Sequence, residues 1–199
     1  MELVLLVLAS AALWYFNARD QQQRVRLLAG ILGQFQVEKL METVVDGYLR
    51  ALGESDAGRS TQVWNMLGQA ETTLVGQIQA FVAAFDKVDA AQARFSTLPL
   101  AIPFAAKLFP RATADFRALL RIHAAGVAAV VGNQAALAQK DRAFMLTAEL
   151  LLLQHSCHWF CRSKALASAR TLARHHTPHA QALASVSAGT REAYTRLLG

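Results

Sequence analysis

The residues Leu3–Phe16 (LVLLVLASAALWYF) carry no charge and a single hydroxyl, Ser10. At about 1.5 Å per residue, a helix of this length covers about 21 Å of a hydrocarbon core about 30 Å thick. The run ends in three aromatic residues, where an interfacial belt is expected, and Arg19 follows shortly after. The stretch therefore predicts an N-terminal transmembrane anchor helix over residues 1–18, with residues 19–199 forming a single α-helical domain.

Two other interpretations of this apolar run stay open. A cleavable signal peptide requires a cationic start, where this chain has Glu2, although Ala9-Ser10-Ala11 matches a small-x-small cleavage pattern. A buried amino-terminal core helix is compatible with the short length of the run. We adopt the anchor, which makes the run an uncleaved signal anchor.

The charges after the run predict its orientation. Arg19, Arg24 and Arg26 follow it, and the acidic residue among them is Asp20. The positive-inside rule then places the amino terminus outside and the C-terminal domain in the cytoplasm, as a single-pass protein of the inner (cytoplasmic) membrane. Two cysteines in 199 residues do not form a disulfide framework, which is compatible with a reducing compartment.

The composition and the apolar spacing predict the fold class. The chain is 54% hydrophobic and 17% charged, which excludes intrinsic disorder. Apolar residues recur in steps of three and four, while strand-type alternation does not persist. We predict an all-α fold in which the anchor helix precedes an antiparallel helical bundle of about five to six helices.

Capping residues, prolines and glycines place the individual helices. Ser60 and Asp141 are predicted N-caps, and Pro178 suits the first turn of a helix. The apolar segment Ser96–Pro110 must be buried or lie on a membrane, because it would otherwise expose an aggregation-prone patch. The predicted helices are residues 21–52, 60–85, a short helix between Pro103 and Pro110, 113–132, 141–172, one starting at Thr177-Pro178, and one after Ser187–Thr190 ending at Leu198.

The charge is divided unevenly along the chain. Residues 1–89 have a net charge of −3, and residues 90–199 have +9 and all six histidines. Beside a membrane, the basic half suits the anionic leaflet. The dispersed basic residues and the lack of a binding motif disfavour nucleic acid. A solvated face without a partner is the alternative.

The densest group of potential ligands is His155–Cys161 (HSCHWFC). In a helix, Cys157, His158 and Cys161 could converge on a metal, with His155 as a further candidate. The spacing is C-x3-C, however, and not the C-x2-C of structural zinc sites. Both cysteines also fall on the apolar stripe of the helix, so core packing is the interpretation that we favour. We expect no cofactor, the alternatives being a metal, a haem or a thiol switch.

A second group of polar residues surrounds the predicted corner at Pro178. Histidines titrate at about pH 6.5. The histidines of the two groups would therefore form a pH-sensitive cationic patch if they met at this corner. Solvated loop histidines are the alternative. The candidates for an anion- or partner-facing edge are Arg162, Arg170, Arg174, His175, His176 and His179.

The sequence offers little for catalysis. It has no Gly-rich phosphate loop, no H-E-x-x-H, no G-x-S-x-G and no C-x-x-C motif. Glu149 is the one carboxylate inside the apolar AELLLLQ stretch. We predict that it forms a structural ion pair with an arginine such as Arg117 or Arg121, the alternative being a catalytic acid.

The amino-terminal part of the chain resembles a known family. The anchor ending in Tyr15-Phe16-Asn17, and then Met41-Glu42-Thr43-Val44 and Gly47-Tyr48, are similar to the amino end of LemA-type proteins. Those proteins are amino-anchored helical bundles, and the resemblance implies the same architecture here. No function is carried across.

Three functions follow from these patterns. The first is a non-enzymatic interaction or scaffold module at the cytoplasmic membrane face, with a protein partner or self-association. The alternatives are a metal-, haem- or thiol-based sensor using Cys157, His158 and Cys161, and a membrane-associated enzyme with a buried site at Glu149.

Overall fold

The computed structural model describes residues 1–199, apart from the side chains of Ala57, Ala106 and Lys107. The chain is 79% helical and 3% strand, so the prediction of a mostly helical protein is confirmed. The α-helices are α1 (Glu2–Leu32), α2 (Val37–Gly53), α3 (Ala57–Phe85), α4 (Ala90–Ala93), α5 (Ala105–Leu108), α6 (Phe116–Val131), α7 (Gln139–Cys161), α8 (Lys164–His175), α9 (His179–Ser185) and α10 (Ala188–Leu198).

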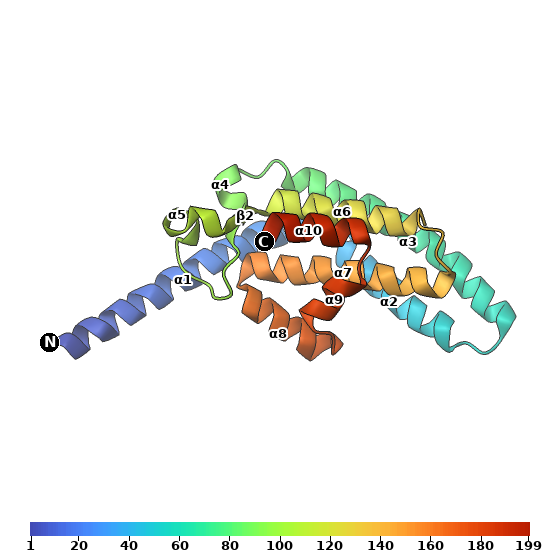
Figure 1. Ribbon diagram of the computed structural model, residues 1–199, viewed down its shortest axis with the longest axis horizontal. Coiled ribbons are helices and arrows are strands. Elements are labelled where there is room, and N and C mark those ends of the chain that lie inside the picture. Colours follow the sequence, from blue (N-terminus) through green and yellow to red (C-terminus); the bar gives the residue numbers. More distant parts are fainter.

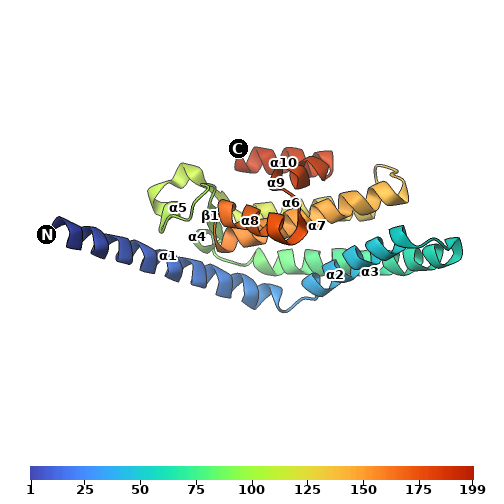
Figure 2. The same cartoon turned by 90° about the horizontal axis from the view of Figure 1, so that it is seen from below.

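The apolar run and the first part of the body form one continuous helix, α1. Its side chains are exposed from residue 2 to residue 16, and burial against the body begins only at Asn17. Of the residues that the structure describes, those of α1 form the one helix long and apolar enough to cross a membrane. The amino-terminal half of α1 projects beyond the rest of the chain (Figures 1 and 2).

The prediction of one helix over residues 21–52 is wrong, because the chain turns between α1 and α2. The N–H of Gly33 donates to the carbonyl of Ala29, which closes the last turn of α1. Gln36 then donates its N–H to Oε1 of Gln77 at 2.9 Å, and α2 begins at the next residue. Two glycines, Gly30 and Gly33, weaken the helix just before this break.

The helix α3 starts earlier than predicted, with its N-cap four residues before the predicted one. Its N-cap is Asp56, whose carboxylate accepts the N–H of Arg59 at 2.7 Å, and not Ser60. The helices α2 and α3 pack against each other along their length, burying Val44 and Leu74.

Figure 2 shows the body in three tiers: α1, α2 and α3 below, α6, α7 and α8 in the middle, and α9 with α10 above. The central helix α7 contacts α1, α2, α6, α8 and α9. At its carboxyl end the core is aromatic, with the rings of Phe116 and Phe160 stacked at 4.3 Å and Phe95 edge-on to both. The tiers are thus joined through α7 and through α6, which contacts α3 and α10.

Two short strands, not predicted from the sequence, bracket α5. The strands β1 (Arg94–Ser96) and β2 (Thr113–Asp115) are antiparallel, with Phe95 opposite Ala114. Three residues are too few to show a strand-type alternation in the sequence. The short helix predicted between Pro103 and Pro110 is confirmed as α5.

The long helix predicted over residues 141–172 is also wrong, because α7 ends at Cys161. A new helix, α8, starts after Ser163, whose hydroxyl accepts the N–H of Leu166 at 3.2 Å. The same type of cap starts α10, where the hydroxyl of Ser187 accepts the N–H of Thr190. The Ser163 cap makes the corner that brings α8 back against α7.

Candidate functional site

Helix α7 carries Glu149 and the four predicted metal ligands, and it buries several polar side chains. Glu149, His155 and Ser156 are each no more than 1% exposed. A buried polar group costs free energy unless it finds a partner, so each of these side chains requires a specific neighbour. Those neighbours come from α6, α8, α9 and α10.

Three histidines gather in the interior between α6, α7 and α9. The rings of His155 and His179 pack against each other at a tilt of 33°, with centroids 4.2 Å apart. Nε2 of His179 is 3.1 Å from the hydroxyl oxygen of Tyr194, and Nε2 of His123 is 2.9 Å from Oγ of Ser156. This set of five residues, which we call the histidine cluster, joins three helices to α10.

Burial keeps the cluster uncharged. It lowers the pKa of His123 to about 3, and it lowers the pKa of His155 to about 3, with a further lowering by the neighbouring His179 and Lys164. The pKa of His179 is also lowered, mainly by burial. The three imidazoles are therefore neutral at pH 7, and they act as polar parts of the core.

The predicted anion-facing group divides into half-buried and exposed members. His179 belongs to the histidine cluster, and His175 is half-buried with Nε2 2.9 Å from Oε1 of Gln154. Arg162 is exposed and donates to Oε1 of Gln21 on α1 at 2.6 Å. The other exposed members of the group are Arg170, Arg174 and His176.

The four predicted metal ligands do not converge. Cys157 and Cys161 pack against the apolar core, and burial raises the pKa of both thiols, that of Cys161 to about 11. His155 turns instead toward α8, where its Nε2 is 3.0 Å from Oγ of Ser168, and the pKa of His158 is lowered by burial and by Arg170. The described residues contain no group of three His, Cys, Asp or Glu arranged to hold a metal.

Glu149 does not form the predicted ion pair with Arg117 or Arg121. Those arginines pair with Asp115 at 2.7 Å and with Asp86 at 2.9 Å. Oε1 of Glu149 accepts the backbone N–H of Ser187 at 3.0 Å, so the carboxyl group supports the start of α10. Burial raises the pKa of Glu149, against the lowering effect of its hydrogen bonds from Thr190 and Ser187.

The carboxyl group of Glu149 fits because the facing residue on α6 is a glycine. A Cβ on Gly126 would overlap Oγ1 of Thr190 and would lie 2.6 Å from Oε2 of Glu149. Helices α6, α7 and α10 thus meet at one point where a side chain is excluded. The predicted ion pair of Glu149 is therefore wrong, because its carboxyl group accepts a backbone N–H and has no arginine partner among the salt bridges of the described residues.

Sequence analysis missed a second buried polar network, formed by Tyr48, Glu71 and Arg142. Glu71 is 1% exposed, and its carboxylate accepts from the guanidinium of Arg142 at 2.6 Å and from the hydroxyl of Tyr48 at 2.5 Å. The pKa of Tyr48 is raised by burial and by the bond to Glu71. The signal was present, because Glu71 falls on the apolar stripe of α3 between Leu67 and Leu74.

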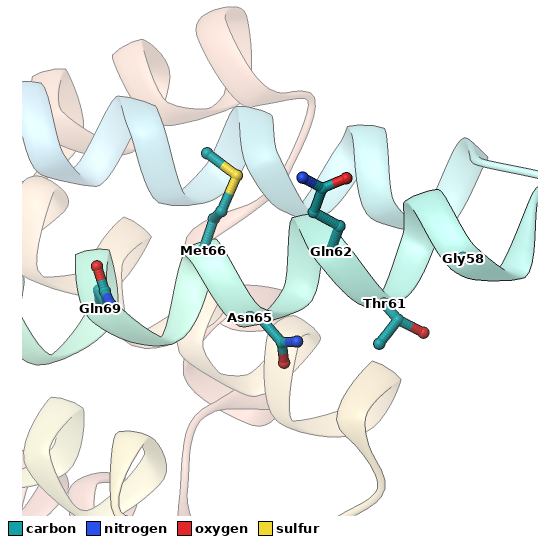
Figure 3. Close-up of a pocket in the computed structure, with 6 residues that line it drawn as sticks. All are labelled: Gly58, Thr61, Gln62, Asn65, Met66 and Gln69. Atoms are coloured by element: carbon teal, nitrogen blue, oxygen red, sulfur yellow. The ribbon is translucent and has the colours of Figure 1, made fainter.

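The surface also has an open hollow of about 380 Å³ on α3. In the view of Figure 3, Met66 and Gln62 project on one side of the helix, and Asn65 and Thr61 on the other. Its lining residues, all from this one helix, are Gly58, Thr61, Gln62, Asn65, Met66 and Gln69. The lining is amide, hydroxyl and thioether, which provides no ionisable group for acid–base chemistry.

No family model, curated protein or solved structure matches this chain.

Proposed function

We propose that the chain is a single-pass membrane protein whose helix α1 is an uncleaved signal anchor. The amino terminus lies outside, and the body, an antiparallel helical bundle, lies at the cytoplasmic face of the inner membrane. The observation that carries this proposal is the exposure of every side chain from residue 2 to residue 16 of α1. Such a continuous apolar surface is costly in water and suits lipid.

The dimensions of α1 support a span. The 31 residues of the helix extend over about 46 Å, of which the uncharged run supplies about 21 Å. A bilayer can thin locally to accept a short run, at a cost of fractions of a kcal/mol per Å. The carboxyl half of α1 packs on the core through Leu28, so the helix would hold the body directly against the membrane.

The role that we propose for the body is non-enzymatic: an interaction or scaffold module for the anionic leaflet or for a protein partner. The two most buried carboxylates support this role, since Glu149 holds the start of α10 and Glu71 pairs with Arg142. Arg170 and Arg174 support it too, because both remain exposed on α8 for an anionic partner.

Carbonate extraction of membranes that contain the full chain tests the anchor. We expect the native chain to stay in the membrane pellet. The variant Leu5→Asp/Leu8→Asp should move to the supernatant, because each Asp costs about 2.5–3.5 kcal/mol at the centre of a membrane helix.

The matched control is Leu49→Asp/Leu52→Asp, which changes two exposed leucines at the same spacing on α2. It should stay in the pellet like the native chain. Release of the native chain, or equal release of the two variants, would overturn the proposed anchor.

A further inference from the structure

A second exposed apolar surface lies on the segment around α5. Leu100, Phe104, Leu108 and Phe109 are 68%, 50%, 62% and 46% exposed. These four side chains fall within ten residues of chain, whereas the other large exposed apolar side chains of the body are scattered over α1, α2, α3, α7 and α8. We call these four residues the α5 patch. A group of this kind marks an interaction surface.

The segment that carries the α5 patch is firmly fixed at both ends. The strands β1 and β2 close its base, and the N–H of Thr97 donates to the carbonyl of Ala112 at 2.9 Å. Nε1 of Trp159 donates to the carbonyl of Ser96, and the N–H of Ala165 donates to the carbonyl of Pro99, each at 3.0 Å. The fixed base holds the patch in a defined place on the surface.

That place is beside the end of the apolar run of α1. The rings of Phe16 and Phe104 are 5.6 Å apart, and Phe16 is the last residue of the run. Both views of the fold show α5 next to α1 (Figures 1 and 2). A cavity of about 10 Å³ between α1 and the segment has Asn17 and Leu100 among its lining residues. The patch therefore lies at the level where α1 changes from apolar to polar.

The segment that carries the α5 patch is basic, although Asp20 of α1 lines the same small cavity as Leu100. Residues 94–114 contain no Asp or Glu, and exposed arginines flank the patch at Arg94 and Arg111. Arg19, also exposed, follows the apolar run on α1. Apolar side chains bordered by arginines match the surface of an anionic bilayer, in which the apolar groups enter the acyl boundary and the cations meet the headgroups.

We propose that the α5 patch is a second membrane contact, inserted into the headgroup–acyl boundary of the leaflet from which α1 emerges. This inference rests on the proposed anchoring by α1. Interfacial segments enter about 5–10 Å into this boundary, which the position of Phe104 beside Phe16 allows. With two contacts, the body has a fixed orientation on the membrane.

Depth-dependent quenching in vesicles tests this contact. The full chain with Leu108→Cys carries a nitrobenzoxadiazole label and is reconstituted into phosphatidylethanolamine–phosphatidylglycerol vesicles. Nitroxide lipids labelled at acyl carbon 5 or carbon 12 act as quenchers. We expect at least twofold stronger quenching by the carbon-5 nitroxide than by the carbon-12 nitroxide. The native chain, treated with the same reagent, supplies the background from Cys157 and Cys161.

Two matched positions make the result specific. Leu6→Cys on α1 reports the anchor and should be quenched inside the bilayer. Met66→Cys replaces an exposed side chain on α3 and should resist both nitroxides. If Leu108→Cys is quenched no more than Met66→Cys while Leu6→Cys is quenched, the second contact is wrong and the anchor stands. If the carbon-12 nitroxide quenches Leu108→Cys more strongly than the carbon-5 nitroxide does, the proposed interfacial position of the α5 patch is also wrong. An unquenched Leu6→Cys overturns the anchor and the second contact together.

Discussion

The contact between α6, α7 and α10 at Gly126 predicts a large effect from adding one methyl group. In Gly126→Ala, the new Cβ would overlap Oγ1 of Thr190 and come within 2.6 Å of Oε2 and 3.0 Å of Cδ of Glu149. Both neighbours are buried, so the atoms must move at the expense of packing or of the hydrogen bond that the N–H of Ser187 donates to Glu149.

The magnitude follows from three contributions. Overpacking of a core costs about 1–3 kcal/mol. Disturbing the hydrogen bond of a buried carboxyl group adds about 1–3 kcal/mol. The higher helix propensity of alanine returns up to about 1 kcal/mol. We therefore expect a loss of about 2–4 kcal/mol in the free energy of unfolding, which lowers Tm by about 5–15 °C in a chain of this size.

The assay is thermal unfolding of the full chain in detergent, followed by circular dichroism at 222 nm. Gly76→Ala is the control, because Gly76 is also inside a helix and a Cβ there would meet nothing within 4 Å. Gly76→Ala should leave Tm unchanged or raise it slightly. Equal Tm values for the two variants would refute the close approach at Gly126. Thr190→Ala combined with Gly126→Ala should cost less than the sum of the two single changes.

Three further predictions concern other buried groups. Arg142→Leu should cost about 3–5 kcal/mol in chemical denaturation because it leaves Glu71 buried and unpaired, and the double variant Glu71→Leu/Arg142→Leu should cost less than that single change. Because the pKa values of His123 and His155 fall from 6.5 to about 3 on folding, the unfolded chain binds more protons below pH 6.5. Stability should thus be intact above pH 6.5 and fall by about 2 kcal/mol per ring at pH 5, and a pH-independent Tm from pH 8 to 5 would contradict this. With a pKa of about 11, Cys161 should be alkylated slowly at pH 8, because its thiolate fraction is about 100-fold below that of a thiol with pKa 9. Alkylation of Cys161 at the rate of an exposed cysteine would contradict this prediction.

The sequence predicted the helical class, but two helix breaks required tertiary information. Apolar spacing continues through Gly33 and through Arg162, and no proline marks either point. At the first break, Gln77 on α3 accepts the N–H of Gln36, and at the second, Ser163 caps α8. Ser60 was the predicted cap of α3, whereas the observed hydrogen bond from the N–H of Arg59 shows that Asp56 is the cap.

The candidate site was predictable in part. Burial of Glu149 followed from its apolar surroundings, but its partner, the N–H of Ser187, lies 38 residues away on a different element. The histidine cluster depends on the corner near Pro178, where His179 turns inward against His155 while His176 stays exposed. No local pattern distinguishes those two histidines, because the difference arises from how α9 packs on α7.

Labelling from the two sides of the membrane tests the central claim, that α1 spans the bilayer and the body is cytoplasmic. Glu2→Cys and Glu192→Cys place a thiol at each end of the full chain, and the native chain gives the background. In right-side-out vesicles, a membrane-impermeant maleimide should label Glu2→Cys at once and Glu192→Cys only after permeabilisation. Equal labelling of both positions before permeabilisation would contradict a span, and the reverse order would contradict the orientation.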